Sequence, residues 1–486
     1  MMLNDMLRRA GMDEDTGLPP VAITGLTADS RLVAPGFLFA ALPGAQADGR
    51  RFIPQAVQAG AAVILAPSGT EWPASVPRRL LIRHPEPRRA LALMAAEFAG
   101  AQPETIVAVT GTNGKTSTVD FLRQIWSLSG DKAASLGTLG VIAPGHAGGT
   151  GLTTPDPVAL ALTLAGLARE GVRRAALEAS SHGLSQFRLD GVHLAAAGFS
   201  NLTRDHLDYH GSLEAYRAAK LRLFADLLPE GAPAVVNADM DAETLGALKR
   251  VAVARRLTLR LIGEHGDAVR LLSATPRPDG QVLRVRHDGA EEEIFLPLPG
   301  RFQADNALMA AALAQATGIS RAAWPLLAKL HGVRGRMQLA ATLPNGAAAY
   351  VDYAHTPDAL ERLLTALRPH TERRLVCVFG AGGDRDPGKR KLMGEAVARL
   401  ADVAVVTDDN PRGENPAAIR AAILAGCQGA IEIGDRAQAI AAALGMLGAG
   451  DVLVVAGKGH EQGQTIAGVV HPFDDAAVIA GLVGAA

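Results

Sequence analysis

Apolar runs separated by polar loops divide the chain into three blocks. Residues 1 to about 88 mix short apolar strands with turns and end in a link rich in proline and arginine. From about 89 to 334, short apolar strands alternate with helical patterns, which predicts a parallel sheet covered by helices. The expected strands of these two blocks lie at 36–41, 62–66, 106–110, 175–178, 195–200 and 234–237.

The third block, from about 335 to 486, contains three buried-strand patterns, each followed by a polar loop. Because the carboxyl ends of parallel strands meet at one edge of a sheet, we expect these loops to form a ligand site. We therefore predict an α/β protein with domains at 1–88, 89–334 and 335–486. The strands of the third block are expected at 374–379, 403–407 and 452–456, and its loops at 380–386, 408–412 and 457–461.

The stretch Val107 to Ser117 is an apolar strand that runs into a glycine turn, a lysine and two hydroxyl residues. Glycines 111 and 114 allow backbone N–H groups to point inward, and Lys115 is expected to reach terminal phosphate oxygens. A hydroxyl of Thr116 or Ser117 suits a magnesium ion. A helix over 118–126 would direct its positive end at the anion. Since Val109 replaces the first glycine of the usual pattern, this is a variant P-loop that predicts nucleotide binding.

Bulk composition agrees with a globular protein of about three domains. The 48 Lys and Arg residues nearly balance the 49 Asp and Glu residues, so nothing draws the whole chain to nucleic acid or to an anionic membrane. We find no signal-peptide core and no apolar run of about 18 residues. Cys377 lies inside an apolar strand, which suits a reducing compartment. We expect a cytoplasmic protein, acting as a monomer on small molecules.

Residues 212–224 form a helical pattern with Ser212 as its cap. Lys220 lies on the apolar stripe of this helix, where an ammonium group needs a reason. It is either a lysine whose amine reaches water at the edge of the core or a desolvated lysine of depressed pKa. A desolvated amine could react with carbon dioxide to give a carbamate.

Two polar loops follow strands of the same predicted sheet. Residues 179–188 follow the strand that ends at Glu178, and residues 201–210, with two histidines four apart, follow another. The histidine pair alone is compatible with a surface pair, a metal site or unrelated loop residues. A carboxylate, an imidazole and an anionic lysine derivative beside a P-loop would form a cage for magnesium.

Together these motifs closely resemble the Mur ligases of peptidoglycan synthesis, and the match covers essentially the whole chain in order. The resemblance implies a small N-terminal α/β uridine-binding domain, a central P-loop ATPase domain with a parallel sheet, and a C-terminal Rossmann-like domain. The motifs that carry it are Gly111-Thr-Asn-Gly-Lys-Thr116, Glu178-Ala-Ser-Ser-His-Gly-Leu184, 201–210, Lys220 and Asp352-Tyr-Ala-His-Thr-Pro-Asp358.

Within the family, the segments 27–31 and 409–412 are similar to those of members that add meso-2,6-diaminopimelate to the D-glutamate of UDP-N-acetylmuramoyl-L-alanyl-D-glutamate. The resemblance implies an ATP-dependent amide-forming ligase that works through an acyl phosphate, in cell-wall biogenesis, cell shape and division. It implies ATP binding by Gly111, Thr112, Asn113, Gly114, Lys115, Thr116, Ser117, Asn306 and Arg336. It implies binding of the UDP substrate by Ala28, Ser30, Ala45, Gln46, Ala47, Thr153, Thr154, Ser180, Gln186 and Arg188.

The resemblance also assigns the catalytic metal and the amino-acid site. Lys220 would be carbamylated to N6-carboxylysine by carbon dioxide, and would bind magnesium together with Thr116, Glu178 and His206. Catalysis would depend on Lys115, Lys220, His206 and Glu178. Diaminopimelate would be held by Arg385, Asp409, Asn410, Pro411, Arg412, Gly457 and Glu461.

Two positions depart from the family pattern, because Gln303 stands where asparagine is usual and Gln338 where glutamate is usual. Three alternatives remain open. They are the same ligase acting on L-lysine, a folylpolyglutamate synthase, and a nucleotide-binding scaffold without catalysis. The 409–412 loop favours diaminopimelate, the uridine-type first domain argues against the second alternative, and the polar acceptor residues argue against the third.

Overall fold

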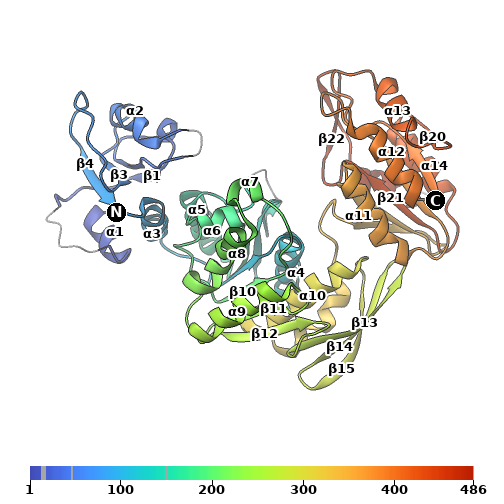
Figure 1. Ribbon diagram of the computed structural model, residues 1–486, viewed down its shortest axis with the longest axis horizontal. Helices are drawn as coiled ribbons and strands as arrows, with labels where there is room; N and C mark the ends of the chain where they lie inside the picture. The colour runs from blue at the N-terminus through green and yellow to red at the C-terminus, as the bar shows by residue number, and fades with distance from the viewer. Residues whose placement is uncertain (13–17, 45–46, 148–151, 485–486) are drawn as a thin grey trace. The chain divides into compact units, whose positions relative to one another are not determined.

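The computed structural model describes residues 1–12, 18–44, 47–147 and 152–484. It divides into two compact units, shown with their elements in Figure 1. One unit consists of Met1–Leu261 with Ala312–Ser320, and the other consists of Ile262–Ala311 with Arg321–Ala486. None of the helices in the described ranges is long and apolar enough to span a bilayer.

The first unit begins with a small four-stranded parallel sheet in the order β1-β2-β3-β4. Alternate strand residues pack on its two faces: Leu38 and Val63 belong to a core shared with α1 and α3, whereas Phe39 and Ile64 pack with α2. The strands predicted at 36–41 and 62–66 are confirmed. The elements are α1 (Leu3–Arg9), β1 (Gly25–Thr27), β2 (Phe37–Ala40), α2 (Ile53–Gln58), β3 (Val63–Pro67), β4 (Leu80–His84) and α3 (Pro87–Ala99).

The larger sheet of this unit contains five parallel strands in the order β11-β10-β5-β9-β6, and β7 and β8 extend it with antiparallel pairing. Its strands alternate with helices, as the sequence predicts. They are β5 (Thr105–Thr110), β6 (Ala133–Gly137), β7 (Gly140–Ala143), β8 (His146–Ala147), β9 (Arg174–Glu178), β10 (Ala196–Phe199) and β11 (Pro233–Asn237). The helices are α4 (Lys115–Leu128), α5 (Pro157–Arg169), α6 (Ser181–Ser185), α7 (Leu207–His210), α8 (Leu213–Arg222) and α9 (Ala242–Ala254).

An antiparallel meander opens the second unit and was not predicted. Its strands β13 (Val269–Arg277), β14 (Gly280–His287) and β15 (Ala290–Leu296) pair in sequence, after β12 (Thr258–Gly263) and before α10 (Arg301–Ala314). The missed signal is the alternation of apolar and polar residues along 280–287, followed by the turn dipeptide Asp288-Gly289.

A six-stranded sheet in the order β16-β17-β21-β18-β19-β20 forms the rest of the second unit, and only β16 pairs antiparallel within it. Cys377 and Phe379 pack toward α11, α12 and α13, whereas Val376 and Val378 pack toward α14 and α15. The three predicted strands are confirmed as β18 (Leu375–Phe379), β19 (Val403–Val406) and β21 (Val452–Ala456). The other elements are β16 (Gln338–Thr342), β17 (Ala348–Asp352), α11 (Pro357–Leu367), α12 (Lys389–Leu400), α13 (Pro416–Leu424), β20 (Ile431–Glu432), α14 (Arg436–Gly445), the hairpin β22 (Gly463–Ile466) and β23 (Val469–Pro472), and α15 (Asp475–Gly484).

Candidate active site

The glycine turn after β5 has the geometry of a phosphate-binding loop. Gly111 adopts φ 147° and Gly114 φ 85°, and a Cβ on Gly111 would lie 1.9 Å from the Ser200 hydroxyl oxygen. Glycine is therefore required at position 111. The helix α4 begins at Lys115, so its free N–H groups face the loop as predicted. The Lys115 ammonium folds back and donates to the carbonyl oxygens of Gly111 and Thr112, each at 2.9 Å.

Thr116 and Glu178 meet beside this loop. The Thr116 hydroxyl donates to Glu178 Oε1 at 2.8 Å, and the backbone N–H of Thr138 donates to the same oxygen at 2.8 Å. The Glu178 side chain is buried, and burial raises its pKa, while the hydrogen bonds and Lys115 act in the opposite direction. Two predicted residues, one in α4 and one at the end of β9, are thus brought into direct contact.

Lys220 points into the core, as the helical stripe of α8 predicts. Its side chain is 1% exposed, and its ammonium donates to the Gly111 carbonyl at 2.7 Å, the same carbonyl that Lys115 contacts. The ammonium also lies 4.5 Å from the centre of the Tyr216 ring. Burial lowers the pKa of Lys220 well below its ordinary value, and Lys115 lowers it further, while Asp205 opposes the shift.

The predicted cap of this helix is also confirmed, because the Ser212 hydroxyl accepts the Ala215 N–H. The predicted end at 224 is wrong. The α-helical hydrogen bonds end at Arg222, and residues 223–227 continue as a π-helix.

His206 lies in a cluster of aromatic side chains. The contacts that the structure describes do not place it against Glu178. It has φ 51°, lies 3.6 Å from an Asp205 oxygen through Nε2, and packs edge-on against His182 with ring centres 4.9 Å apart. Its side chain is 49% exposed. Within the described ranges, no group of three or more His, Cys, Asp or Glu side chains is placed to hold a metal ion. The ligand role of His206 stays a prediction.

The residues predicted to hold the acceptor gather around the end of β9. The Thr154 hydroxyl donates to the Glu178 carbonyl at 2.8 Å and lies 3.0 Å from the Ser180 hydroxyl. Arg188 donates to the Thr154 carbonyl at 2.6 Å and to the Gln186 side chain at 2.7 Å. Thr153 joins the group through its hydroxyl, 3.1 Å from that of Thr138.

The predicted uridine residues lie in the small N-terminal sheet region. The Ser30 hydroxyl donates to the Gln55 side chain at 3.0 Å, Ala28 is exposed, and the carbonyl of exposed Ala47 accepts the Gly44 N–H. Ala45 and Gln46 lie outside the described residues, so their predicted role stays a prediction.

The departures from the family pattern occur beside the two predicted nucleotide residues of the second unit. Asn306 donates to Gln303 Oε1 at 3.1 Å, and both side chains are buried. Gln338 accepts the Gly335 N–H at 2.8 Å, next to Arg336. The Arg336 guanidinium lies 5.1 Å from the centre of the Tyr353 ring. Glutamine therefore makes ordered contacts at both positions.

The loop after β19 carries the predicted amino-acid residues Asp409 to Arg412. Asp409 and Asn410 are buried, at 7% exposure each. Arg412 has φ 52°, pairs by backbone with the β22 strand, and donates its side chain to the Gly383 carbonyl at 2.7 Å. One edge of its guanidinium is thereby fixed to the loop after β18.

The loop after β21 supplies Gly457 and Glu461. Gly457 adopts φ 121°, and a Cβ there would lie 2.4 Å from Asp409 Oδ2, so only glycine fits. Glu461 accepts the Asn410 amide at 2.9 Å. Arg385, in the loop after β18, is exposed. The three loops that the sequence predicts to meet thus do so, because the loop after β19 contacts both the loop after β18 and the loop after β21.

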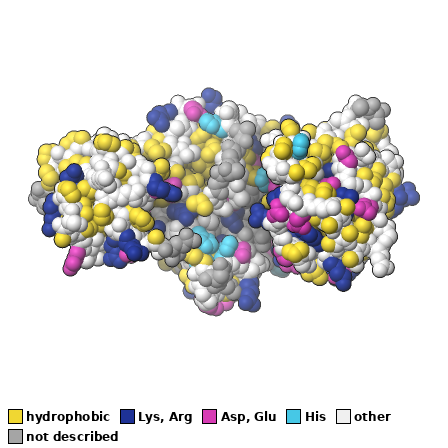
Figure 2. All heavy atoms as spheres, turned by 90° about the horizontal axis from the view of Figure 1, so that it is seen from above, with side chains coloured by type: hydrophobic (Ala, Val, Ile, Leu, Met, Phe, Trp, Pro, Cys, Tyr) yellow, Lys and Arg dark blue, Asp and Glu magenta, His cyan; other side chains and the backbone are white. Residues whose placement is uncertain are grey.

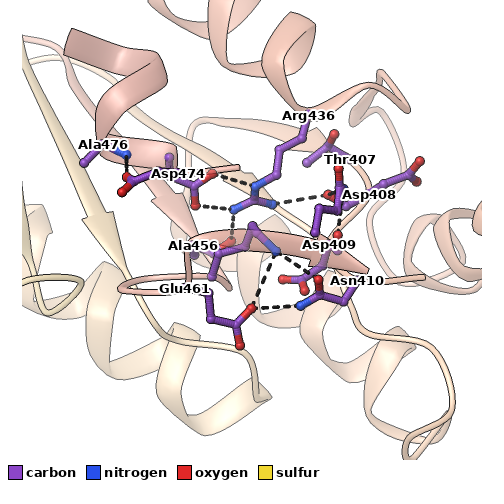
Figure 3. A network of polar contacts seen from close by, with 12 residues as sticks. Thr407, Asp408, Asp409, Asn410, Arg436, Ala456, Glu461, Asp474 and Ala476 are labelled. Atoms are coloured by element: carbon purple, nitrogen blue, oxygen red, sulfur yellow. Dashed lines mark hydrogen bonds and ion pairs between the residues drawn. The ribbon is translucent and has the colours of Figure 1, made fainter. Parts of the chain in front are cut away.

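Sequence reasoning missed the buried cations behind these loops. Arg436 in α14 is fully buried and forms two 2.7 Å contacts with the carboxylate of Asp475. It also donates to the carbonyls of Ala456 at 3.0 Å and Asp408 at 3.4 Å (Figure 3). It therefore ties the ends of β21 and β19 together. Arg436 lies on a helix, and no local sequence pattern pointed to it. Lys458, between two glycines directly after a buried strand, carried a signal that was not used.

The surface shows no strong charge bias on the visible face, where basic and acidic side chains are interspersed (Figure 2). This agrees with the near balance of charges in the sequence. Specific binding therefore depends on the local sites described above.

Three family models match successive parts of the chain. The Mur ligase family catalytic domain matches residues 22–99, the Mur ligase middle domain matches 109–314, and the Mur ligase glutamate ligase domain matches 335–459. A relative from Caulobacter vibrioides is 57% identical, with 94% of each chain covered. One from Agrobacterium fabrum is 52% identical, covering 94% of this chain and 92% of its own. Both are named UDP-N-acetylmuramoyl-L-alanyl-D-glutamate--2,6-diaminopimelate ligase.

A solved structure of a protein with the same ligase name is 34% identical, with a TM-score of 0.79, over 100% of this chain and 99% of that chain. Sequence and structure therefore agree over nearly the whole length. The chain belongs to the Mur ligase family.

Proposed function

We propose that this protein is an ATP-dependent ligase that joins meso-2,6-diaminopimelate to the D-glutamate of UDP-N-acetylmuramoyl-L-alanyl-D-glutamate. The names of relatives at 52% and 57% identity support this substrate pair. The observation that carries the proposal is the meeting of Lys115, Lys220 and the Thr116–Glu178 pair at one phosphate-binding loop. The reaction serves peptidoglycan biosynthesis, and through it cell shape and division.

The chemistry begins with a carboxylate that an amine cannot attack productively. A carboxylate oxygen of D-glutamate takes the γ-phosphoryl group of ATP, which gives an acyl phosphate and ADP. The amine of diaminopimelate then attacks the acyl carbon, the carbon–oxygen bond to phosphate breaks, and amide, inorganic phosphate and a proton are released. Catalysis rests on positioning and on neutralising the charge of the transferring group.

Lys115 is the group best placed to neutralise that charge. Among the described residues, its ammonium donates to two neutral carbonyls of its own loop. Anionic phosphate oxygens form stronger, charge-assisted hydrogen bonds than carbonyls. Binding of ATP is therefore expected to turn Lys115 from the Gly111 and Thr112 carbonyls toward the phosphates.

The side chains at this loop fit a magnesium ion. Thr116 and Glu178 place oxygen donors 2.8 Å apart, and magnesium prefers oxygen ligands and keeps several waters. Together with His206 and a carbamate on Lys220, these residues would hold it. Bound magnesium would neutralise phosphate charge and orient the transferring group.

Carbamylation of Lys220 is the finer part of the proposal. A buried ammonium beside a second ammonium favours the neutral amine, and a neutral amine adds to carbon dioxide to form a carbamate with loss of a proton. The product is an anion in place of a cation, so repulsion from Lys115 becomes attraction. Carbon-13 NMR with labelled bicarbonate should reveal a carbamate resonance that the Lys220→Ala variant lacks.

The same variant tests the role of the carbamate in the reaction. Lys220→Ala should lose ligation, and short-chain carboxylates should restore part of it by occupying the vacated space. A folded Lys220→Ala variant with full activity would contradict the proposal. Thermal melting separates this outcome from simple unfolding.

Selection of diaminopimelate over lysine requires a cation for the extra carboxylate. The Arg412 guanidinium is planar and presents several N–H groups, one of which donates to the Gly383 carbonyl. Arg385 is an exposed guanidinium on the neighbouring loop, available for the same or the other carboxylate. A guanidinium left unpaired by lysine would cost about 2 to 5 kcal/mol, enough for a strong preference.

The decisive assay measures phosphate release with ATP, magnesium and UDP-N-acetylmuramoyl-L-alanyl-D-glutamate, comparing meso-diaminopimelate, L-lysine and no amino acid. Release with diaminopimelate alone is expected. Equal release with lysine would contradict the role of Arg412, and no release with either would contradict the proposed reaction. We propose a cytoplasmic location because ATP is the energy source and both cysteines are free buried thiols.

A further inference from the structure

Lys458 is a fully buried lysine to which neither the family resemblance nor the mechanism above gives a role. It follows β21 in the loop that ends at Glu461, and its side chain is 0% exposed. Its ammonium donates to Asn410 Oδ1 at 3.0 Å and lies 3.5 Å from Glu461 Oε2. A buried charge is tolerated only where it is paired, so these two contacts determine the free-energy cost of burying the Lys458 ammonium.

Both partners of Lys458 are residues assigned to the amino-acid site, and they also contact each other (Figure 3). Asn410 donates its amide to Glu461 Oε2 at 2.9 Å. Its Oδ1 accepts a second hydrogen bond, from the backbone N–H of Thr465 at 2.9 Å. The Asn410 side chain is thereby locked between the hairpin, Lys458 and Glu461.

The two oxygens of Glu461 have different surroundings. Oε2 faces both the Asn410 amide and the Lys458 ammonium, whereas the described residues provide no hydrogen-bond partner for Oε1. The Glu461 side chain is 34% exposed, so solvent reaches part of it. One oxygen is anchored by the protein, and the other is left to accept a hydrogen bond from outside.

The other buried cation nearby does not replace Lys458. Arg436 is already paired with the carboxylate of Asp475 through two contacts of 2.7 Å. Burial lowers the pKa of Lys458, and Asp409 and Glu461 oppose that shift, so its charge depends on these neighbouring carboxylates. The 3.5 Å contact and the shared Asn410 side chain therefore couple Lys458 to the position of Glu461.

We propose that Lys458 is a positioning residue for the amino-acid substrate. Through Asn410 and directly, it holds the Glu461 carboxylate in place, turned so that Oε1 accepts an ammonium group of diaminopimelate. The inference rests on the proposed function, and it adds a residue that does not itself touch the substrate. It predicts an effect confined to the amino-acid substrate.

The test is a double-mutant cycle in the phosphate-release assay with the full-length protein. Wild type, Lys458→Met, Glu461→Gln and the double variant are compared, with diaminopimelate varied at saturating ATP and nucleotide substrate. The exposed Lys391 pairs with Glu395 at 3.6 Å in the same unit, and Lys391→Met is the matched control. Thermal melting of each variant monitors folding.

We expect Lys458→Met to raise the KM for diaminopimelate about tenfold or more, the effect of losing one hydrogen bond to a charged group. The KM for ATP should stay within about twofold of wild type. The double variant should be no worse than Glu461→Gln alone, because Lys458 acts through Glu461. Lys391→Met should behave as wild type.

An unchanged KM for diaminopimelate in Lys458→Met, effects that multiply in the double variant, or an equal rise in the KM for ATP would each overturn the inference. If Lys458→Met does not fold, Lys458→Gln retains a donor for Asn410 without the charge and replaces it in the cycle. A wild-type protein that releases no phosphate with diaminopimelate would instead overturn the proposed function, and this inference with it.

Discussion

The position of the Glu178 carboxylate can be tested by adding one methyl group. Gly137 ends β6, beside the end of β9, and a Cβ on it would lie 2.0 Å from Glu178 Oε1 and 2.5 Å from Cδ. Ordinary contacts of a Cβ begin at 3.4 Å. In Gly137→Ala the carboxylate must therefore retreat by roughly 1 Å or more, because the surrounding core is close-packed.

This retreat would break two hydrogen bonds. Glu178 accepts from the Thr116 hydroxyl and from the Thr138 N–H, both at 2.8 Å. A hydrogen bond to a charged group contributes about 1.5 to 3 kcal/mol, so the two together correspond to about 3 to 6 kcal/mol. If the transition state loses this stabilisation in full, kcat/KM falls by about 10² to 10⁴.

The assay is phosphate release at increasing magnesium concentration, with Gly166→Ala as the matched control. Gly166 lies inside α5, and a Cβ there meets nothing within 4 Å. The control should keep full activity and gain about 0.5 to 1 kcal/mol of stability, since alanine is the better helix former. Thr116→Val removes the hydroxyl donor without adding bulk, and should also lose activity.

A folded Gly137→Ala protein whose kcat/KM stays within about threefold of wild type would refute the assignment of Glu178. Equal losses of kcat/KM in Gly137→Ala and Gly166→Ala would point to a general effect of replacing glycine by alanine. Melting curves for all three variants exclude unfolding as the cause of an activity loss.

Three further predictions concern the second unit. Arg412→Ala should raise the KM for diaminopimelate by about 30-fold or more while the KM for ATP is unchanged, and titration of each substrate checks this. Arg436→Met should lower the free energy of unfolding by about 3 to 5 kcal/mol in urea because it leaves Asp475 buried and unpaired, and an added Asp475→Leu should recover most of the loss. Burial opposes ionisation of Asp451, but Arg374 and two backbone N–H groups outweigh it and hold its pKa below the ordinary 3.8. Asp451 therefore stabilises the fold above that pH, and the stability gap between wild type and Asp451→Asn should shrink as the pH falls below 3.8; a gap that does not depend on pH would contradict this.

Local patterns predicted those features whose cause is local. The phosphate loop requires glycines, a lysine and a following helix within a few residues, so Gly111 to Ser117 could be interpreted directly. The inward direction of Lys220 follows from the 3.6-residue period of α8, because its apolar neighbours fix which face is buried. The meeting of the three loops in the second unit follows from the shared direction of parallel strands.

Contacts between distant segments could not be predicted in this way. The contact of Thr116 with Glu178, the convergence of Lys115 and Lys220 on one carbonyl, and the buried Arg436–Asp475 pair join residues 39 to 109 positions apart. Periodicity states which face of an element is buried, but not which side chain of another element it meets. Those partners are chosen by close packing and by the need to pair each buried charge.

The chain's own pattern of residues therefore establishes the phosphate loop, the inward lysine and the sheet edge at which the amino-acid loops gather. Only folding decides that Asn410 is locked between Lys458 and Thr465, and that Glu461 is left with one open oxygen. The physical reason is that hydrogen bonds and ion pairs act over about 3 Å, whereas sequence separation places no limit on which groups reach that distance.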